Sequence, residues 1–275
     1  MNIADRLGET LLERGSIVEV PTWQALDVEG KPQGRTFEIC NCIVDCTIDE
    51  AVTLEGVNLP WAENQFQERV SGKPWNPGET YKEWPWAKAS EEHKPQGKFS
   101  HTYGERYYPN PNEFGDKHVG IRYVYGDLDD VVNLLAKQPT TRQAYLPVFF
   151  PEDTGAVHGE RIPCSLGYLF LMRENKLNIT YYIRSCDFYR HFRDDVYMTA
   201  RLCQWVLEQL VPRKFVDPPH YFSEEQRPEE RDYDNPVDPW AKVEVGRLTM
   251  HIGSLHVFEG DLPRLRREYG SKRNL

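Results

Sequence analysis

Strand-like and helix-like apolar patterns alternate along this chain, and that alternation is what most constrains its fold. The longest helical pattern spans residues 196–211, where apolar side chains recur at helical spacing before Pro212 ends it. Further helical patterns are predicted at 3–14, 59–71 and 127–137, and strands at about 16–28, 36–48, 143–150, 166–173, 176–184 and 246–258. No repeat is visible. We therefore predict a single α+β domain over residues 1–275, with a polar surface excursion at about 212–240.

The amino-acid composition predicts a globular protein and argues against several classes of partner. Apolar residues make up 39% of the chain and aromatic residues 12%, enough to form a packed core. No apolar run is long enough to span a membrane, and the first residues lack the layout of a signal peptide, so a cytoplasmic location is expected. A net charge of −10 argues against nucleic-acid and membrane partners, although a few arginines can still bind an anionic small molecule.

The six cysteines are too sparse for a disulfide framework. Alternation in the strand at 36–48 places Cys40, Cys42, Val44 and Cys46 on one face as small apolar side chains. Their spacing does not match a zinc site, so no metal is expected.

Residues 73–97 form a Trp-, Pro- and Gly-rich stretch without sustained periodicity. It is predicted to be a long ordered loop whose tryptophans, Trp75 and Trp84 among them, pack against the rest of the protein.

Four short motifs occur in a fixed order. Pro139-Thr-Thr-Arg142 comes first, and Pro163-Cys164 then stands at the mouth of a strand. Arg184-Ser-Cys-Asp187 follows, and Gly253-Ser-Leu-His256 closes the series. Taken alone, a cysteine before a strand is more often a buried small side chain than a nucleophile. The ordered set, however, resembles the thymidylate synthase family over residues 127–211 and 246–261, with a weaker match at Tyr103-Gly104.

This resemblance implies a homodimer with shared active sites, built on a large mixed sheet. It also implies transfer of a one-carbon unit from 5,10-methylenetetrahydrofolate to C5 of a pyrimidine nucleoside monophosphate. In the family pattern Cys164 is the nucleophile and Tyr103 assists removal of the C5 proton. A glutamate transfers protons, and both Glu63 and Glu68 are candidates for it.

Other positions match the family's ligand contacts. Arg184 and Ser185 correspond to its phosphate-binding pair, and Arg142 to an arginine delivered across the dimer interface. A second arginine that often follows is Gln143 here. His256 corresponds to the histidine that contacts the sugar hydroxyl.

Further matches concern the sugar and the folate. The tyrosine that usually stands two residues after His256 is Phe258, which removes one sugar contact and leaves ribose and deoxyribose both open. Asp187 and Trp84 are the expected folate contacts, and Asp187 is expected to contact the nucleotide as well. Core packing explains Trp84 equally well.

The base is expected to be read by a carboxylate. Thymidylate synthases have an asparagine eight residues after the motif aspartate, and ungapped counting from Asp187 reaches Asp195. A carboxylate accepts from the N4 amine of cytosine, and its protonated form can donate to N3. Asp195 therefore points to cytosine, as in the deoxycytidylate hydroxymethylases of this family. A one-residue gap would give the role to Asp194, and either aspartate could instead cap the following helix.

Departures from the synthase pattern bear on the product. Ser165, Ile183 and the pair Arg190-His191 replace residues typical of synthases, the pair lying where the family packs its folate. A more polar pocket there favours attack by water, which yields a hydroxymethyl group. The sequence thus predicts a hydroxymethyltransferase acting on dCMP or CMP. Methylation of dUMP and a non-catalytic nucleotide-binding descendant are the alternatives. The basic tail, Arg264 to Arg273, is predicted to be a solvated end.

Overall fold

A computed structural model gives the architecture of the chain. It describes residues 2–20, 34–73, 75–84, 97–108, 127–154, 162–210, 240 and 242–270.

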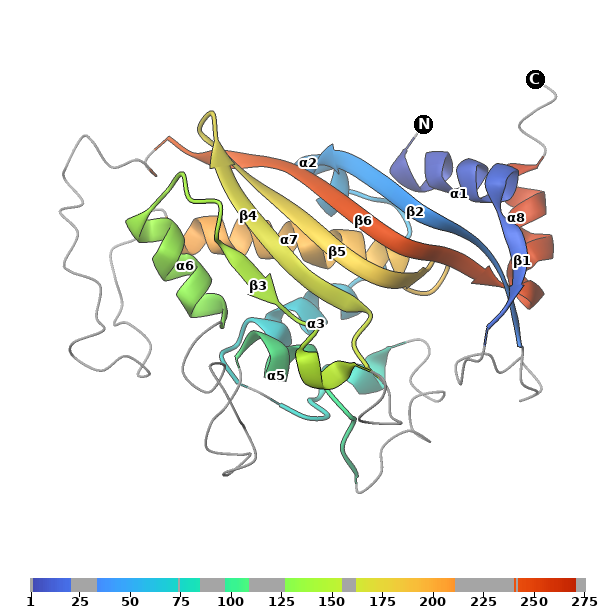
Figure 1. Ribbon diagram of the computed structural model, residues 1–275, viewed down its shortest axis with the longest axis horizontal. Helices are drawn as coiled ribbons and strands as arrows, with labels where there is room; N and C mark the ends of the chain where they lie inside the picture. Colours follow the sequence, from blue (N-terminus) through green and yellow to red (C-terminus); the bar gives the residue numbers. More distant parts are fainter. Residues whose placement is uncertain are drawn as a thin grey trace.

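Within these ranges six strands form one mixed sheet, ordered β1-β2-β6-β5-β4-β3 (Figure 1). Neighbouring strands are antiparallel except for the parallel pair β5 and β6. The strands are β1 (Ser16–Glu19), β2 (Arg35–Thr47), β3 (Tyr145–Pro147), β4 (Ser165–Arg173), β5 (Lys176–Asp187) and β6 (Glu244–Phe258). The helices are α1 (Ile3–Arg14), α2 (Ile48–Val52), α3 (Trp61–Arg69), α5 (Tyr103–Tyr107), α6 (Leu128–Lys137), α7 (Phe192–Leu210) and α8 (Leu262–Tyr269), with 3₁₀ turns η1 (Thr80–Glu83), η5 (Pro151–Asp153) and η7 (Glu259–Asp261).

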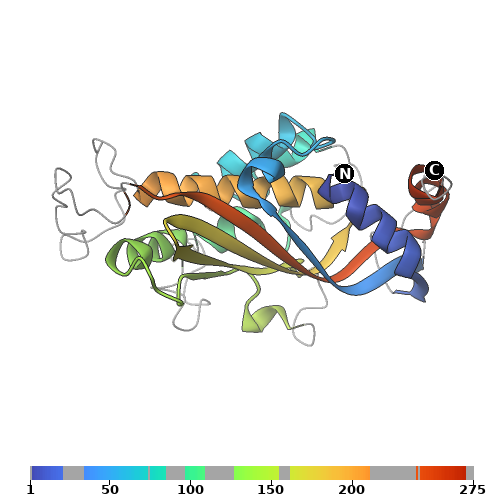
Figure 2. The ribbon, with the colours of Figure 1, turned by 90° about the horizontal axis from the view of Figure 1, so that it is seen from above.

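Helix α7 runs along one face of the sheet, and α2 and α3 lie on the same side (Figure 2). Its inward positions, from Val196 to Leu210, are apolar except for Thr199, and they are almost fully buried. They pack against the inward side chains of β5 and β6, such as Ile179, Tyr181 and Met250, which are also buried. This burial fixes the first turn of α7 near the ends of β5 and β6, because a helix held along its whole length cannot rotate.

The three central strands share an irregularity at one level across the sheet. On β2 the buried positions change from Cys42 to Ile39, and on β6 from Ile252 to Leu255, so that each alternation shifts by one residue. Asn41 has a positive φ of 59° at this level, as bulged strand residues often do. A Cβ on Gly253 would lie 2.8 Å from the carbonyl oxygen of Arg184, so only glycine allows β5 and β6 to approach this closely.

The α+β class is confirmed, and most predicted elements are present with small changes in their ends. The prediction for Cys40 was wrong. Its side chain is exposed, whereas Cys42 and Cys46 are buried, because the irregularity at Asn41 interrupts the alternation. The strand predicted at 143–150 is shortened to β3.

Two predictions about solvation were also wrong. The first part of the basic tail belongs to helix α8 (Leu262–Tyr269), which lies beside α1 (Figure 1). Leu262, Leu265 and Tyr269 of this helix are buried. Trp75 remains 43% exposed. The excursion at 212–240 lies outside the described residues except for Trp240, which is buried.

Among the described helices, none has the length and apolar character that crossing a bilayer requires.

The close approach of β5 and β6 predicts a stability difference between two glycine substitutions. Gly253→Ala should lower the free energy of unfolding by about 1–3 kcal/mol, because the added methyl group meets backbone that cannot move aside. Gly34→Ala is the matched control, since nothing lies within 4 Å of its Cβ, and it should change stability by no more than about 0.5 kcal/mol. Urea unfolding of both variants measures the difference, and equal stabilities would contradict this account of Gly253.

Candidate active site

One cavity of about 190 Å³ collects most of the residues that the sequence singled out. It lies among α3, the segment before α5, the mouth of β4, the end of β5, the start of α7 and the end of β6. The expected residues that line it are Glu68, Trp84, Tyr103, Cys164, Ser185, Asp187, Asp194, Asp195 and His256. Segments far apart in the sequence therefore converge on one place.

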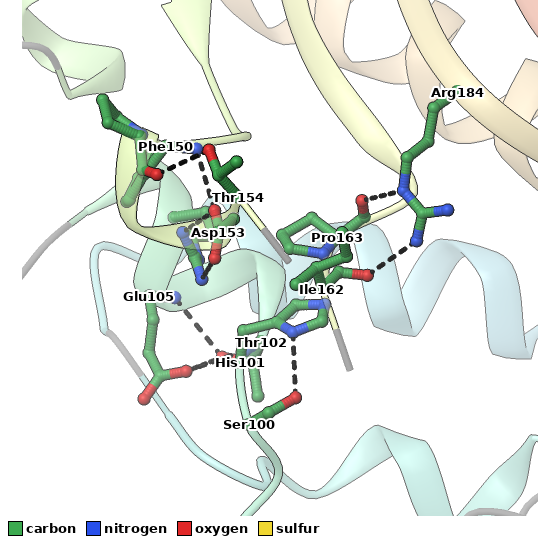
Figure 3. A network of polar contacts seen from close by, with 12 residues as sticks. Ser100, His101, Thr102, Glu105, Phe150, Asp153, Thr154, Ile162, Pro163 and Arg184 are labelled. Carbon is green, nitrogen blue, oxygen red and sulfur yellow. Dashed lines mark hydrogen bonds and ion pairs between the residues drawn. The ribbon is translucent and has the colours of Figure 1, made fainter. Parts of the chain in front are cut away.

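Cys164 is half-buried and directly precedes β4. Arg184 on β5 donates from Nε to the carbonyl oxygen of Pro163 at 2.9 Å and from Nη2 to that of Ile162 at 3.1 Å (Figure 3). The same Nη2 lies 3.9 Å from the Sγ atom of Cys164. The sequence-predicted nucleophile therefore lies next to a guanidinium.

The two adjacent aspartates differ in their partners. Asp194 is almost fully buried, and its two oxygens accept from the backbone N–H and the side-chain amide of Asn58 at 2.9 and 2.8 Å. The side-chain carboxyl of Asp195 has one weak hydrogen bond from a described residue, the thiol of Cys186 at 4.0 Å. Its carboxyl is therefore the one available to a ligand.

Burial raises the pKa of Asp195 to about 7, since charging a carboxylate away from water is unfavourable. Arg69 opposes this increase in the pKa, and the neighbouring Asp194 adds to it. A carboxyl with this pKa can both give and take a proton near neutrality.

Tyr103 begins α5 and is linked to the mouth of β4. Its hydroxyl oxygen accepts from Ser165 at 3.1 Å, and Ser165 also bonds the hydroxyl of Tyr181. The N-terminus of α5 is held by a capping box between Thr102 and Glu105, next to the Ser100–His101 hydrogen bond (Figure 3). Burial raises the pKa of Tyr103 to about 12, so its hydroxyl stays protonated and can orient a ligand or a water molecule.

The two candidate glutamates on α3 point in different directions. Glu63 lies outside the cavity, where its carboxylate binds Arg201 at 2.9 and 3.0 Å and accepts from Tyr197 at 2.8 Å. The hydrogen bond from Arg201 lowers the pKa of Glu63 to about 2. Glu68 lines the cavity, but one of its oxygens accepts the backbone N–H groups of Glu79 and Thr80 at 2.8 and 3.1 Å.

The carboxylate of Asp187 is bound by its own chain. Its Oδ1 accepts the backbone N–H groups of Tyr189 and Arg190, and its Oδ2 accepts Nη1 of Arg190 at 2.8 Å. The same Nη1 reaches Asp261 at 2.8 Å, just before α8. This network fixes the turn between β5 and α7, so Asp187 has little capacity left for a ligand.

Aromatic and imidazole rings line another side of the cavity. Trp84 stacks on His191 with ring centroids 5.1 Å apart and tilts toward Trp61 at 6.1 Å. The Nε1 of Trp84 is buried without a hydrogen-bond partner among the described residues. Burial lowers the pKa of His256, so that its imidazole is neutral at neutral pH.

Arg142 is exposed before β3 and does not line this cavity. The geometry of one chain therefore brings Cys164 and Asp195 to a shared cavity and leaves Glu63 and Arg142 apart from it.

Sequence reasoning missed Gln65 and Arg69, which line the cavity from α3. Together with Trp61 and Glu68 they form one face of the helix, because positions separated by three, four, seven or eight residues coincide on an α-helix. Starting this face at Trp61 would have selected both residues and excluded Glu63.

Comparison with known proteins adds one result at the level of the fold. No protein-family model and no curated protein sequence matches the chain. Among solved structures it is similar to thermostable thymidylate synthase A from Bacillus subtilis, with a TM-score of 0.67 and 15% sequence identity, over 98% of this chain and 83% of that one. The chain therefore has a thymidylate synthase-like α+β fold.

Proposed function

We propose that this chain is a pyrimidine nucleotide C5 one-carbon transferase that hydroxymethylates dCMP or CMP with 5,10-methylenetetrahydrofolate. The observation that carries the proposal is the presence of Cys164 and Asp195 in one cavity together with Ser185 and His256. A thiol and a carboxyl that titrates near neutrality suit two positions on the same pyrimidine ring. The thymidylate synthase-like fold is consistent with this class of reaction.

Cys164 and Asp195 would act on the ring as a pair. The Sγ thiolate bonds to C6, the C5=C6 electron pair moves to the C4–C5 bond, and the C4=N3 pair moves to N3. There it takes the proton of Asp195, which leaves a carboxylate that accepts from N3–H and N4–H. C5 becomes nucleophilic without a charged ring. A pKa of about 7 for Asp195 matches this exchange of a proton at neutral pH.

Arginines would hold the phosphate and the thiolate. Arg184 lies beside Cys164, and Ser185 follows it at the cavity wall. Arg142 is exposed and has no hydrogen bond or ion pair with another described residue. It is therefore available to a phosphate in a second subunit.

The cavity fits a flat heteroaromatic co-substrate. Trp61, Tyr81, Trp84 and Phe99 line it, and the unpaired Nε1 of Trp84 offers a buried donor. Methylenetetrahydrofolate, when bound, supplies a one-carbon unit at the oxidation level of formaldehyde. Trp84 and its neighbours would hold it by stacking, while Asp187 acts mainly on Arg190 and the turn.

The hydroxymethyl product is favoured by the polarity of this wall. His191, one of the departures from the synthase pattern, lines the cavity and stacks on Trp84, so this wall contains a polar ring. An imidazole near the reacting carbon can orient water, which a fully apolar wall would exclude.

Dimer formation would use the sheet face opposite α7. Ile43 on β2 is 63% exposed and pairs in register with His251 on β6, which stacks on Tyr182 of β5 at 5.2 Å. Tyr145 on β3 continues the row, with its ring centroid 6.5 Å from that of Tyr182. Figure 2 shows the helices α7, α2 and α3 gathered on the other side. An apolar and aromatic row across a sheet is suited to a second copy of the same surface.

The first test is direct. The protein should convert dCMP or CMP, with methylenetetrahydrofolate, to a product heavier by a hydroxymethyl group, and mass spectrometry should detect it. Cys164→Ser should abolish both this product and tritium release from 5-labelled nucleotide, because a hydroxyl is hardly ionised at neutral pH. Nucleotide binding should largely survive.

Other outcomes of this assay would reject the proposal in part or whole. A methyl product from dUMP would replace it with the synthase reaction. Nucleotide binding without turnover by the unmodified protein would favour a non-catalytic descendant. Undiminished tritium release from Cys164→Ser would remove Cys164 from the mechanism.

Base choice gives a second prediction. Asp195→Asn should shift the ratio of kcat/KM toward uracil nucleotides by about 1–3 kcal/mol per exchanged polar contact, because an amide donates to O4 and accepts from N3–H. Asp194→Asn is the matched control. It should weaken the contact with Asn58 and lower stability while leaving the base ratio unchanged. The opposite result would assign base reading to Asp194.

Shared active sites give a third prediction. Inactive Arg142→Ala and Cys164→Ala subunits, once mixed and exchanged, should recover activity, since one of the two hybrid sites then has both residues. Activity after mixing, compared with each parent alone, measures this. Complete absence of recovery despite proven subunit exchange would mean that each site is built from one chain.

A further inference from the structure

Three hydroxyl groups form a chain of hydrogen bonds from the core of the sheet to the wall of the cavity. Tyr181 on β5 and Ser165 on β4 are almost fully buried, at 1% and 0% exposure, and neither of them lines the cavity. The two hydroxyl groups are hydrogen-bonded to each other. The Oγ of Ser165 also lies 3.1 Å from the hydroxyl oxygen of Tyr103, which does line the cavity. The chain of hydroxyls therefore ends at the cavity with Tyr103.

The hydrogen atoms of this chain have one arrangement. A serine hydroxyl has a single hydrogen, and that of Ser165 is donated to Tyr103. The bond between Ser165 and Tyr181 must then be donated by the hydroxyl of Tyr181. Each donated hydrogen polarises the next hydroxyl, so that the bonds strengthen one another toward the cavity. Tyr103 is thereby fixed as the acceptor of the last bond in the chain.

The hydrogen of the Tyr103 hydroxyl is left for the cavity. Within the described part of the chain, the bond from Ser165 is the one hydrogen bond that this hydroxyl makes. The guanidinium of Arg69, 4.2 Å over the ring of Tyr103, has no acceptor to offer. Because burial raises the pKa of Tyr103 to about 12, its hydroxyl keeps the hydrogen at neutral pH. Such a donor requires an acceptor from a ligand or from water in the cavity.

The sequence position of Ser165 relates this donor to the thiol. Ser165 directly follows Cys164, so the Tyr103 hydroxyl that it binds lies on the same side of the cavity as the thiol. In the proposed reaction the thiolate of Cys164 bonds to C6 of the pyrimidine. The neighbouring ring atom C5 and its substituent then lie on this side as well.

We propose that the Tyr103 hydroxyl donates to the oxygen of the group installed at C5, first as the attacking water and then as the hydroxymethyl product. Ser165 and Tyr181 are positioning residues that fix Tyr103 as a donor. The inference rests on the proposed function. A methyl group has no acceptor for this hydrogen, so the chain of hydroxyls favours the hydroxymethyl product over the methyl product.

The attacking water uses both of its lone pairs. One accepts the hydrogen of Tyr103, and the other bonds to the exocyclic methylene carbon that the one-carbon transfer leaves at C5. The C=C electron pair moves to C5–C6, and the C6–S bond breaks with its pair going to Sγ of Cys164. The thiolate takes the proton that the water loses, so the thiol is restored. Tyr103 keeps its own hydrogen throughout and acts by orienting the water.

The first experiment measures binding and needs no turnover. Isothermal titration calorimetry compares the affinities of the 5-hydroxymethyl and 5-methyl forms of dCMP and CMP. The unmodified protein should bind the hydroxymethyl form about tenfold more tightly, the effect expected of one hydrogen bond. Tyr103→Phe should abolish this preference. Ser165→Ala should reduce it by about threefold or more, because the Tyr103 hydroxyl can then rotate away from the ligand.

Two further variants complete the set. Tyr181→Phe leaves Ser165 able to accept from Tyr103, which turns the hydrogen away from the cavity, so this change should also reduce the preference. Tyr197→Phe is the matched control. Tyr197 is buried like Tyr181, but its hydroxyl donates to Glu63 at 2.8 Å outside the cavity, and the preference should remain as in the unmodified protein.

Single-turnover kinetics separate positioning from packing. In Ser165→Ala, tritium release from 5-labelled nucleotide should proceed near the parental rate, while the hydroxymethyl product should form at least about tenfold more slowly. The reason is that the oriented water is needed only after the C5 proton has left. A general packing defect would slow both steps together.

Neutron diffraction from crystals of the ligand-free protein locates the hydroxyl deuterium atoms directly. The deuterium of Tyr181 should point to Ser165, that of Ser165 to Tyr103, and that of Tyr103 into the cavity. This measurement depends on neither a nucleotide nor a reaction.

Each outcome bears on a stated claim. A Tyr103 deuterium that points to Ser165 overturns the inference, as do equal affinities of the unmodified protein for the hydroxymethyl and methyl forms. An unchanged preference in folded Ser165→Ala overturns the positioning role, and Tyr181→Phe decides it if the alanine variant does not fold. If the unmodified protein forms no hydroxymethyl product, the proposed function fails, whereas the neutron and binding measurements still decide whether Tyr103 is a fixed donor.

Discussion

The burial of α7 against the sheet is the constraint on which the rest of the structure depends. This helix contacts β5 and β6 on one side and α2, α3 and α6 on others, so it connects nearly every layer of the core. Its apolar positions are buried along its whole length, which removes any freedom to rotate. The first turn, with Asp194 and Asp195, is therefore held rigidly beside the ends of β5 and β6. A site that must place a proton accurately benefits from such an attachment.

Charged groups near the cavity fall into two kinds. Asp194 is bound by Asn58, Asp187 by Arg190, and Glu63 by Arg201, so each carboxylate serves the architecture. Asp195 and Arg69 have no such direct pairing among the described residues. Removing both groups from water is unfavourable for folding. Such unpaired buried groups are expected where the partner is a bound ligand. The protein thus binds the carboxylates of Asp194, Asp187 and Glu63 internally and leaves that of Asp195 without a cationic partner among the described residues.

Much of the fold could be predicted because its helices and strands have strong apolar periodicity. The errors have local physical causes. Cys40 was assigned to the buried stripe of β2, but the positive φ of Asn41 and the close contact at Gly253 shift the alternation there. This shift involves three strands at once, and no single strand reveals it. Helix α8 was missed because its few apolar residues, such as Leu262 and Leu265, stand among charges and gain their stability only by packing near α1.

The sequence by itself determined the chemistry that is present: a thiol at a strand mouth, an Arg-Ser-x-Asp motif, and an aspartate eight residues after the motif aspartate, where the resemblance would place an asparagine. Only the tertiary structure decided which side chains meet. Glu63 and Gln65 lie two residues apart on α3, yet Arg201 of α7 binds Glu63 on one side while Gln65 faces the cavity. The physical reason is that a residue's chemistry is carried by its own atoms, whereas the direction of its side chain depends on which helix face is buried. Which face is buried depends on contacts with segments more than a hundred residues away in the sequence, such as the contact of Arg201 with Glu63.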